Sequence, residues 1–314
     1  MLNLGFPKGQ FWAPFYFSFL LMIYLKVSKF FIRLFADDTF LCTQNKDLLL
    51  LEREVNTELI KVYKWLASNK LTLNMDKSKC MIISKKKKTS TMSIRINGKE
   101  LKHCDSYKYL GVYIDKDLSW RPHIDHICKK ISKACGALAK TRHYVCDDTL
   151  SSIYYALINS YVRYGVVTWG NASADTLQPL HTLTSRALKI MSSSPFGRVD
   201  VKPIYEYFKV LDVYQTFTLE SGKFVYKSKN ALLPLSNIAS HFTREVTNHG
   251  LGLRNRNNAV SVVPVDLLSS YEQKSIQHRA GKIWDEIPEC VKDSEFFGSF
   301  KRKYKKHLLG TGTE

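Results

Sequence analysis

The sequence predicts an α+β fold in which a small antiparallel sheet is followed by a mostly helical region. Short segments rich in β-branched, aromatic and apolar residues, bounded by turn residues, recur over residues 1–115. Apolar residues at spacings of three and four dominate the next stretch, which is typical of amphipathic helices. We therefore expect three parts, at residues 1–115, 116–195 and 196–314, the last of mixed helix and loop with a basic tail at residues 301–306.

Two adjacent carboxylates, Asp37 and Asp38, interrupt the first strand-like stretch. Residues 30–34 before them and 39–43 after them have strand composition, so the pattern predicts two antiparallel strands joined by a tight turn. Two like charges at such a turn repel each other unless a cation joins them. Mg²⁺ prefers oxygen ligands and is usually held by one or two carboxylates together with substrate phosphates. On the local pattern alone, an ordinary Asx-rich hairpin turn is the preferred interpretation, and a site for metal-assisted nucleotidyl transfer is the alternative.

Further elements follow within the first part. We expect a helix over residues 48–66 with Asp47 as its N-cap, because apolar residues recur there at helical spacing. Residues 79–84 and 107–114 are expected to be strands, and Asn97-Gly98 predicts a hairpin with a type I′ turn. The apolar stripe of the helix consists of Leu48, Leu51, Val55, Leu59, Val62 and Leu66.

Three amphipathic helices are expected in the second part. Their apolar stripes are Ile124, Ile127, Ile131, Cys135 and Leu138; then Leu150, Ile153, Tyr154, Leu157, Ile158 and Tyr161; then Leu180, Leu183, Ala187, Ile190 and Met191. The basic residues Lys129, Lys130, Lys133 and Lys140 lie off the first stripe, where they predict either a nucleic-acid-binding face or a solvated lysine surface. His123, His126 and Cys128 match no standard zinc spacing, and the helical pattern already accounts for that segment.

The charge balance favours an anionic partner. The chain of 314 residues carries 47 Lys and Arg against 28 Asp and Glu, a formal net charge of +19, and nucleic acid is the leading candidate, with an anionic membrane surface as the alternative. Seven scattered cysteines without a Cys-x-x-Cys pair fit a reduced intracellular protein, nuclear or cytoplasmic. The apolar run at residues 11–25 contains a proline and is short for a membrane span, so a buried helix is the preferred interpretation and a membrane anchor the alternative.

Several spaced segments resemble, in the same order, the reverse transcriptases of non-LTR (LINE-type) retrotransposons, in particular the jockey-like branch. The Phe-Ala-Asp-Asp-Thr stretch at residues 35–39 is similar to the catalytic motif of that family, and residues 65–79 resemble its W-L-x-x-N-x-L-x-L-N-x-x-K-[TS] motif. The other segments that carry the resemblance are residues 109–115 with Leu118, Trp120, His123 and Ile124; residues 155–165 with Trp169 and Gly170; and residues 275–288 with Phe300 and Lys301.

This resemblance implies a partial polymerase palm followed by a helical thumb and a C-terminal region. Asp37 would be the principal Mg²⁺ ligand with Asp38 beside it, and Lys77 would be a proton donor to the departing pyrophosphate. The implied reaction is RNA-directed DNA synthesis from dNTPs. The implied nucleotide pocket includes Gly5, Pro7 and Gly9, and the implied contacts to the duplex of RNA template and DNA primer are Lys129, Lys130 and Lys133, with Tyr107 or Tyr109 at the primer strand.

The sequence also departs from the family pattern. Lys8, Gln10 and Ala13 stand where the nucleotide-pocket motif usually has Gln, Ser and Gly. The fingers and the palm strand that carries a further metal-binding Asp precede this motif in the family, and the chain begins almost at the motif. We therefore expect weak or absent Mg²⁺ binding and no activity of this chain alone. The alternative functions are a non-catalytic, basic nucleic-acid-binding remnant and a membrane-anchored protein.

Overall fold

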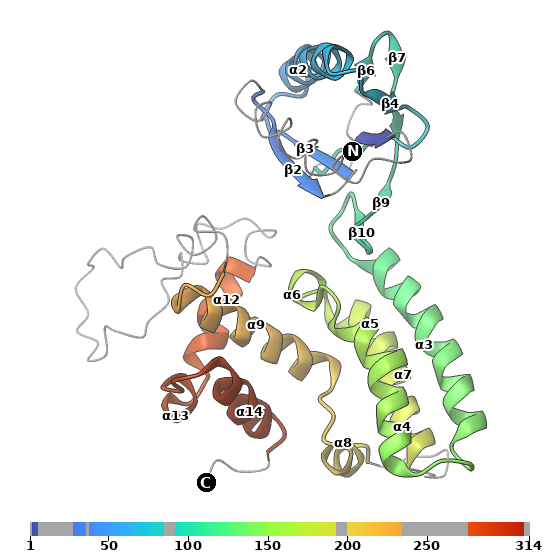
Figure 1. Cartoon of the computed structure of the whole chain (residues 1–314), viewed down its shortest axis with the longest axis vertical. Helices are drawn as coiled ribbons and strands as arrows, with labels where there is room; N and C mark the ends of the chain where they lie inside the picture. Colours follow the sequence, from blue (N-terminus) through green and yellow to red (C-terminus); the bar gives the residue numbers. More distant parts are fainter. Residues whose placement is uncertain are drawn as a thin grey trace. The chain divides into compact units, whose positions relative to one another are not determined.

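The structure, a computed structural model, describes residues 2–5, 28–35, 38–84, 92–192, 200–233 and 276–310 (Figure 1). It has the mixed α+β composition expected, with small sheets first and helices after them. Contacts divide the chain into two compact units, one formed by Met1–Tyr109 with Asp115–Asp117 and the other by Leu110–Ile114 with Leu118–Glu314.

A four-stranded antiparallel sheet organises the first unit. Its order is β2 (Phe31–Phe35), β3 (Asp38–Cys42), β1 (Leu2–Gly5) and β4 (Thr72–Asn74). Phe35 pairs with Asp38 across β2 and β3, and Asn3 of β1 pairs with Asp38 on one side and with Asn74 on the other. Residues 36 and 37, which join β2 to β3, lie outside the described residues.

Helix α2 (Leu48–Ser68) covers one face of this sheet. The predicted helix and its cap are confirmed, because the Asp47 carboxylate accepts hydrogen bonds from the backbone N–H groups of Leu49 and Leu50. The predicted apolar stripe is confirmed as well, with Leu59, Val62 and Leu66 buried and the others packed against them. Each such side chain contributes about 1.5–3 kcal/mol when it is fully buried.

A buried carboxylate ties α2 to the beginning of β2. Glu58 is 5% exposed, and it accepts hydrogen bonds from the backbone N–H of Lys29 at 3.1 Å and from Lys61 Nζ at 2.7 Å. The hydrogen bond from Lys61 is the main reason why the pKa of Glu58 is lowered, against the opposing effect of burial. The interaction fixes the beginning of β2, the strand whose other end leads to the carboxylate pair.

Shorter ladders complete the first unit. The type I′ hairpin is confirmed by antiparallel β6 (Arg95–Ile96) and β7 (Lys99–Glu100), with positive φ at both Asn97 and Gly98. The strand predicted over residues 79–84 is wrong beyond its second residue, because only β5 (Lys79–Cys80) has a ladder partner, the parallel β8 (Lys102–His103). After Cys80 the chain leaves the ladder, and Ile82 packs into the core under α2.

The single strand predicted over residues 107–114 is also wrong. The segment is a hairpin of β9 (Ser106–Tyr109) and β10 (Val112–Asp115), turned by Leu110 and Gly111 with φ of 44° and 82°. Apolar and aromatic residues continue through the turn, so the composition alone resembles one strand. The chain passes from the first unit to the second within this hairpin.

The second unit is helical and has two neighbouring apolar cores. The predicted stripe at residues 124–138 is confirmed, since all five of its residues are buried on α3 (Arg121–Thr141). The third stripe is confirmed on α7 (Ala174–Met191), where Leu183 is the one partly buried member. The remaining helices are α4 (Asp147–Tyr154), η1 (Tyr155–Asn159), α5 (Ser160–Arg163), α6 (Val166–Trp169), α8 (Lys202–Tyr207), α9 (Val213–Lys229), α12 (Ile276–Asp285), α13 (Glu289–Lys292) and α14 (Phe297–Leu308).

The second predicted stripe is only partly right, because its helix contains a π-helical turn, η1. Leu157 and Tyr161 were expected to be buried, yet they are 42% and 39% exposed. Hydrogen bonds in a π-turn run from residue i to i+5 and widen the helix, so residues four apart stay on one face. The buried residues accordingly follow a spacing of four, at Leu150, Tyr154, Ile158 and Val162.

Segments far apart in sequence meet beside β10 in the second unit. The Tyr164 hydroxyl donates a 2.7 Å hydrogen bond to the Leu110 carbonyl oxygen. A Cβ on Gly111 would come within 3.1 Å of the Tyr164 ring. Nearby, Trp169 donates through Nε1 to the Tyr164 carbonyl oxygen at 2.9 Å, and its ring meets the edge of the His123 ring. These contacts anchor the hairpin turn to the helical core.

Two further sequence expectations concern the environment of the chain. All seven cysteines lie within the described residues and are free thiols. Within the described ranges, no helix combines the length and the hydropathy needed to cross a membrane. The apolar run at residues 11–25, expected to be a buried helix, lies outside these ranges.

Acidification should destabilise the second unit through His123. Its side chain is 2% exposed, and its Nε2 has no hydrogen-bond partner among the described residues. Burial, and secondarily the charge of His126, lowers the pKa of His123 from 6.5 to about 4. Between these values the unfolded chain binds the proton and the folded chain does not. The free energy of unfolding should therefore fall as the pH drops from 6.5 toward 4, by at most about 1.4 kcal/mol per pH unit.

Urea denaturation followed by tryptophan fluorescence across this pH range measures the effect. His123→Gln should flatten the pH dependence, whereas His126→Gln, on the same helix, should retain most of it. Equal pH dependence in His123→Gln and the unmodified chain would contradict this assignment.

Candidate active site

The sheet face opposite α2 carries the candidate catalytic carboxylate. Side chains alternate between the two faces of a strand. Because Ile32 points into the core under α2, its neighbour Arg33 lies on the other face, together with Phe40, which pairs with it. Asp38 lies two residues before Phe40 and therefore shares this outer face. Among the predicted catalytic residues, Asp38 is half-buried at the first position of β3, and Asp37 lies outside the described residues.

Two tyrosines of β9 lie within the electrostatic reach of Asp38. Burial raises the pKa of both Tyr107 and Tyr109, and the negative charge of Asp38 raises them further. For Tyr109, Arg33 opposes this effect. The Tyr109 ring also stacks on Phe40, with ring centroids 5.4 Å apart. Tyr109, predicted to contact the primer strand, is thus held beside the candidate carboxylate by an aromatic contact.

The register of the sheet relates Asp38 to Lys77. Asp38 and Asn74 both pair with Asn3, so they lie in one row and on the same face, with β1 between their strands. Two strand spacings separate β3 from β4, about 10 Å. Lys77 is exposed in the turn that follows β4, where its backbone N–H donates to Asn74 Oδ1 at 3.2 Å. The sheet therefore brings Asp38 and the Lys77 turn into one region of the first unit.

This turn gives the Asn-x-x-Lys-Ser part of the motif at residues 65–79 a structural role. Besides the Asn74 side chain, the turn is fixed by Ser78, whose hydroxyl donates to the Asn74 carbonyl oxygen at 2.7 Å. At the other end of the motif, the Asn69 side chain donates to the Trp65 carbonyl oxygen at 2.8 Å and closes α2. Sequence reasoning singled out Lys77 and missed Asn74, although an Asn before a polar turn is a known signal for a side-chain-to-backbone bond.

The predicted nucleotide pocket is described only at Gly5. Gly5 ends β1 and pairs with Thr72, two positions along the strand from the Asn3–Asp38 pair. After Gly5 the chain leaves the sheet, at the same end of the sheet at which β3 begins. Pro7 and Gly9 lie outside the described residues.

The donor set at this end of β3 suits a weakly held cation. Among the described residues, no group of three or more His, Cys, Asp or Glu side chains comes together to hold a metal ion. Asp38 supplies one carboxylate, and Asp37 adjoins it in sequence. Mg²⁺ is commonly bound by one or two carboxylates with the rest of its shell from water and substrate phosphates. The residues thus fit Mg²⁺ only as part of a substrate complex.

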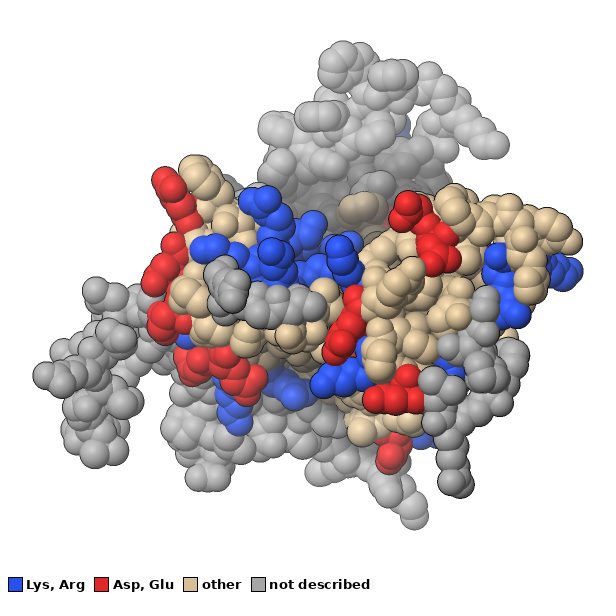
Figure 2. Space-filling model, turned by 90° about the horizontal axis from the view of Figure 1, so that it is seen from below, with Lys and Arg blue, Asp and Glu red and all other residues tan. Residues whose placement is uncertain are grey.

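The lysines predicted to contact nucleic acid lie in the second unit, whereas Tyr109 belongs to the first. Lys129, Lys130 and Lys133 are exposed on α3, as is Lys140. A second group of cations belongs to α14, where Phe300 and Tyr304 are buried and the residues around them are basic. Figure 2 shows Lys and Arg side chains gathered on the side of the view where α14 lies. The segment expected to be a basic tail is therefore a packed amphipathic helix.

Comparison with known proteins gives distant relatives. The chain is 25% identical over 170 residues, 52% of its length, to the RNA-directed DNA polymerase from mobile element jockey of Drosophila melanogaster. It is 26% identical over 175 residues to the jockey polymerase of Drosophila funebris. It is also 24% identical over 144 residues, 43% of its length, to a retrovirus-related Pol polyprotein from type-1 retrotransposable element R1 2 of Nasonia vitripennis.

The matched segments cover 18% of each jockey polymerase and 35% of the Nasonia polyprotein, so the chain spans a minor part of the relatives' length. No family model matches the chain, and no solved structure matches it.

The position of Lys77 should depend on the Asn74 side chain. Asn74→Ala removes the acceptor for the Lys77 N–H and should cost about 1 kcal/mol of local stability. Hydrogen exchange of the Lys77 amide would then be roughly fivefold faster or more. Asn74→Asp keeps an acceptor oxygen and should leave the exchange close to that of the unmodified chain. Unchanged protection in Asn74→Ala would show that other contacts hold the turn.

Proposed function

Since the chain is a distant homologue of the RNA-directed DNA polymerases of jockey-like and R1 non-LTR retrotransposons, we propose that it is the portion of such a reverse transcriptase that carries part of the palm and the thumb. The observation that carries the proposal is the position of Asp38. It begins a central strand of an antiparallel sheet, on the face that α2 leaves uncovered, beside the stacked pair of Tyr109 and Phe40.

In the complete polymerase, the reaction would be attack of a primer 3′-hydroxyl on the α-phosphate of a dNTP. Asp37 and Asp38 would hold Mg²⁺ at the N-terminal end of β3, and the bound ion would neutralise the phosphate oxygens. Lys77, exposed in its Asn74-tied turn, would give a proton to the departing pyrophosphate. Tyr109 would support the primer strand through its fixed ring. Gly5, Pro7 and Gly9 would border the incoming nucleotide.

The thumb would be residues 116–195, which contain the first helices of the second unit. Exposed Lys129, Lys130 and Lys133 give α3 a basic outer face, and the buried stripe of the same helix fixes the direction of that face. Lysines contact phosphates as point charges without reading bases. Such a face suits the duplex of RNA template and DNA primer.

A second candidate function is nucleic-acid binding without catalysis. It is favoured by the net charge of +19 and by the exposed cations of α3 and α14. Lys8, Gln10 and Ala13 depart from the nucleotide-pocket pattern of the family, which points the same way. Two-metal chemistry also requires carboxylates from a second palm strand, and we propose that these 314 residues do not supply them.

The purified chain alone should therefore show no primer extension. With Mg²⁺ or Mn²⁺, a primed RNA template and dNTPs, incorporation should equal that of the Asp37→Ala variant. Gel analysis of a labelled primer measures this directly. Incorporation that is clear in the unmodified chain and lost in Asp37→Ala would overturn the expectation of inactivity and support catalysis at Asp37.

Nucleic-acid binding should be sensitive to salt and largely independent of sequence. If several phosphates are neutralised, the affinity should fall roughly a hundredfold or more between about 50 and 200 mM salt. Reversing Lys129, Lys130 and Lys133 to Glu should weaken binding to all duplexes alike, and each lost phosphate contact should reduce the salt slope by about 0.9. Fluorescence anisotropy with a labelled RNA–DNA duplex measures both quantities.

The matched control reverses three exposed lysines of the first unit, Lys46, Lys64 and Lys99, so the change in net charge is identical. The control should bind more tightly than the α3 variant. If the two variants lose the same affinity, total charge rather than the α3 face governs binding, and the thumb assignment fails.

A further inference from the structure

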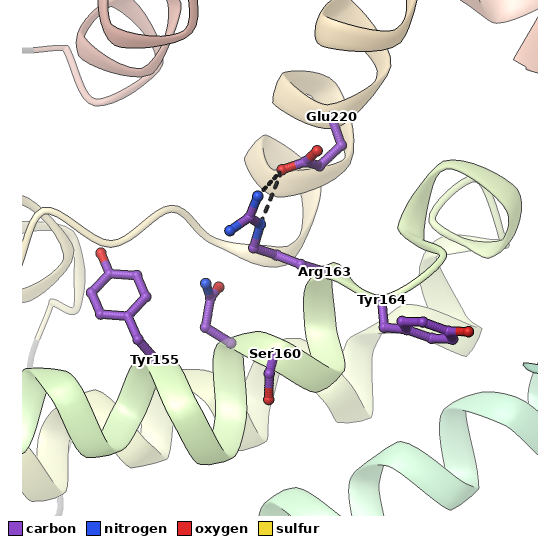
Figure 3. A pocket seen from close by; sticks show the side chains of 6 residues that line it. Tyr155, Ser160, Arg163, Tyr164 and Glu220 are labelled. Atoms are coloured by element: carbon purple, nitrogen blue, oxygen red, sulfur yellow. Dashed lines mark hydrogen bonds and ion pairs between the residues drawn. The ribbon is translucent and has the colours of Figure 1, made fainter. Parts of the chain in front are cut away.

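A pocket opens on the second unit, apart from the residues assigned above. It has a volume of about 380 Å³ and lies between the η1–α5 helix and α9 (Figure 3). In Figure 3, Tyr155 and Arg163 project from that helix, and Glu220 faces Arg163 from α9. The lining residues are Tyr155, Asn159, Ser160, Arg163, Tyr164 and Glu220. Its volume is at the lower end of the range for ligand pockets, which suits a single nucleotide and is too small for a base-paired duplex.

Three lining residues follow one another at a spacing of four. Tyr155, Asn159 and Arg163 share a helix face because the π-turn keeps residues four apart aligned. The face therefore presents an aromatic ring, an amide and a guanidinium in order. The ring is fixed in place, since the Tyr155 hydroxyl donates to the Lys209 carbonyl oxygen at 3.1 Å.

The Asn159 amide is a polar group of the pocket lining that is available to a ligand. Asn159 is only 9% exposed and lines the pocket, and its side chain makes no hydrogen bond with the described residues. Its amide atoms are not among the fully buried polar atoms of the described residues that lack a partner, so they face the open space of the pocket, where a ligand can pair with them. Its donor and acceptor atoms match the edges of nucleobases, which Asn side chains bind in pairs of hydrogen bonds.

The charges around the pocket favour an anion. Glu220 forms ion pairs with Arg163 at 2.8 Å and with Lys223 at 2.6 Å. One carboxylate therefore faces two cations, and a positive charge is left over. Lys305 adds a third cation, with its Nζ 3.4 Å from the Tyr155 hydroxyl. Burial and then the charge of Arg163 lower the pKa of Lys305, as expected where cations are crowded. A phosphate would relieve this repulsion.

We propose that this pocket binds one unpaired nucleotide of a single-stranded nucleic acid, with its base stacked on Tyr155 and hydrogen-bonded to Asn159, and its phosphate held by Arg163 and Lys305. Aromatic stacking combined with nearby cations is the usual way in which proteins hold single strands. The site extends the proposed nucleic-acid binding to a second place on the chain, and it does not depend on α3 or on catalysis.

The test uses the full chain and three fluorescent ligands: a short single-stranded RNA, the DNA of the same sequence, and their duplex. Tyr155→Leu should weaken single-strand binding by about 5- to 100-fold, and Asn159→Leu by about tenfold, with duplex binding unchanged. Tyr155→Phe keeps the ring and should stay within about twofold of the unmodified chain. Tyr161→Leu is the matched control, because Tyr161 is similarly exposed on α5 and does not line the pocket.

Loss confined to RNA, or loss of RNA and DNA alike, supports the site and identifies its ligand. Single-strand affinity unchanged in both Tyr155→Leu and Asn159→Leu overturns it, as does equal loss in Tyr161→Leu. Thermal melting by circular dichroism checks that each variant is folded, and cross-linking of a 4-thiouridine RNA to the peptide containing Tyr155 tests the site without substitution. The α3 variant separates the two proposals, because its failure to weaken duplex binding refutes the thumb and leaves the pocket standing.

Discussion

The candidate active site depends on the pairing of one short strand. β1 lies between β3 and β4, and its Asn3 is opposite Asp38 on one side and Asn74 on the other. A slip of one residue in either pairing would turn a whole strand to the opposite face, so Asp38 or the Lys77 turn would leave the open side of the sheet. The apolar contacts under α2, which bury Ile32 and draw in Leu41 and Leu73, oppose such a slip. The hydrophobic core thus fixes the position of the carboxylate without touching it.

Several residues in the family-like motifs serve the fold, which changes how the resemblance should be weighed. Asn69 closes α2, Asn74 caps a turn, and Gly111 lies under the Tyr164 ring with a positive φ. Trp169 is fully buried, and Arg279 donates a hydrogen bond to Asn171 from a helix more than a hundred residues away. The structural roles of these residues account for their presence in the motifs without any catalytic role. The chemical part of the resemblance rests on fewer residues, chiefly Asp37, Asp38 and Lys77, and for these the proposal needs its own test.

The sequence predicted correctly those features that depend on residues close together in the chain. The helix capped by Asp47, the apolar stripes of α3 and α7 and the Asn97-Gly98 turn depend on neighbouring residues, and all four are confirmed. The Leu110-Gly111 turn was missed because Tyr164 and the core beside β10 stabilise it, and these contacts come from distant sequence. The π-turn was missed because a periodic pattern assumes 3.6 residues per turn. The row of Asp38 and Asn74 could not be foreseen either, since register between strands far apart in sequence follows from packing.

The basic face of α3 and the pocket beside Tyr155 should respond differently to the salt concentration. Lys129, Lys130 and Lys133 are exposed, so solvent and salt screen their charges over about 8–10 Å. At the pocket, the Arg163 side chain is 45% exposed and pairs with Glu220, which is 16% exposed, so this charge is partly shielded from salt on the Glu220 side. Stacking on Tyr155 adds a term that does not depend on counterion release. Attraction along α3 therefore weakens steeply with salt, whereas binding at the pocket would lose its phosphate contribution and keep its stacking contribution. A strand drawn in by the first surface would be held by the second at salt concentrations where the first no longer retains it.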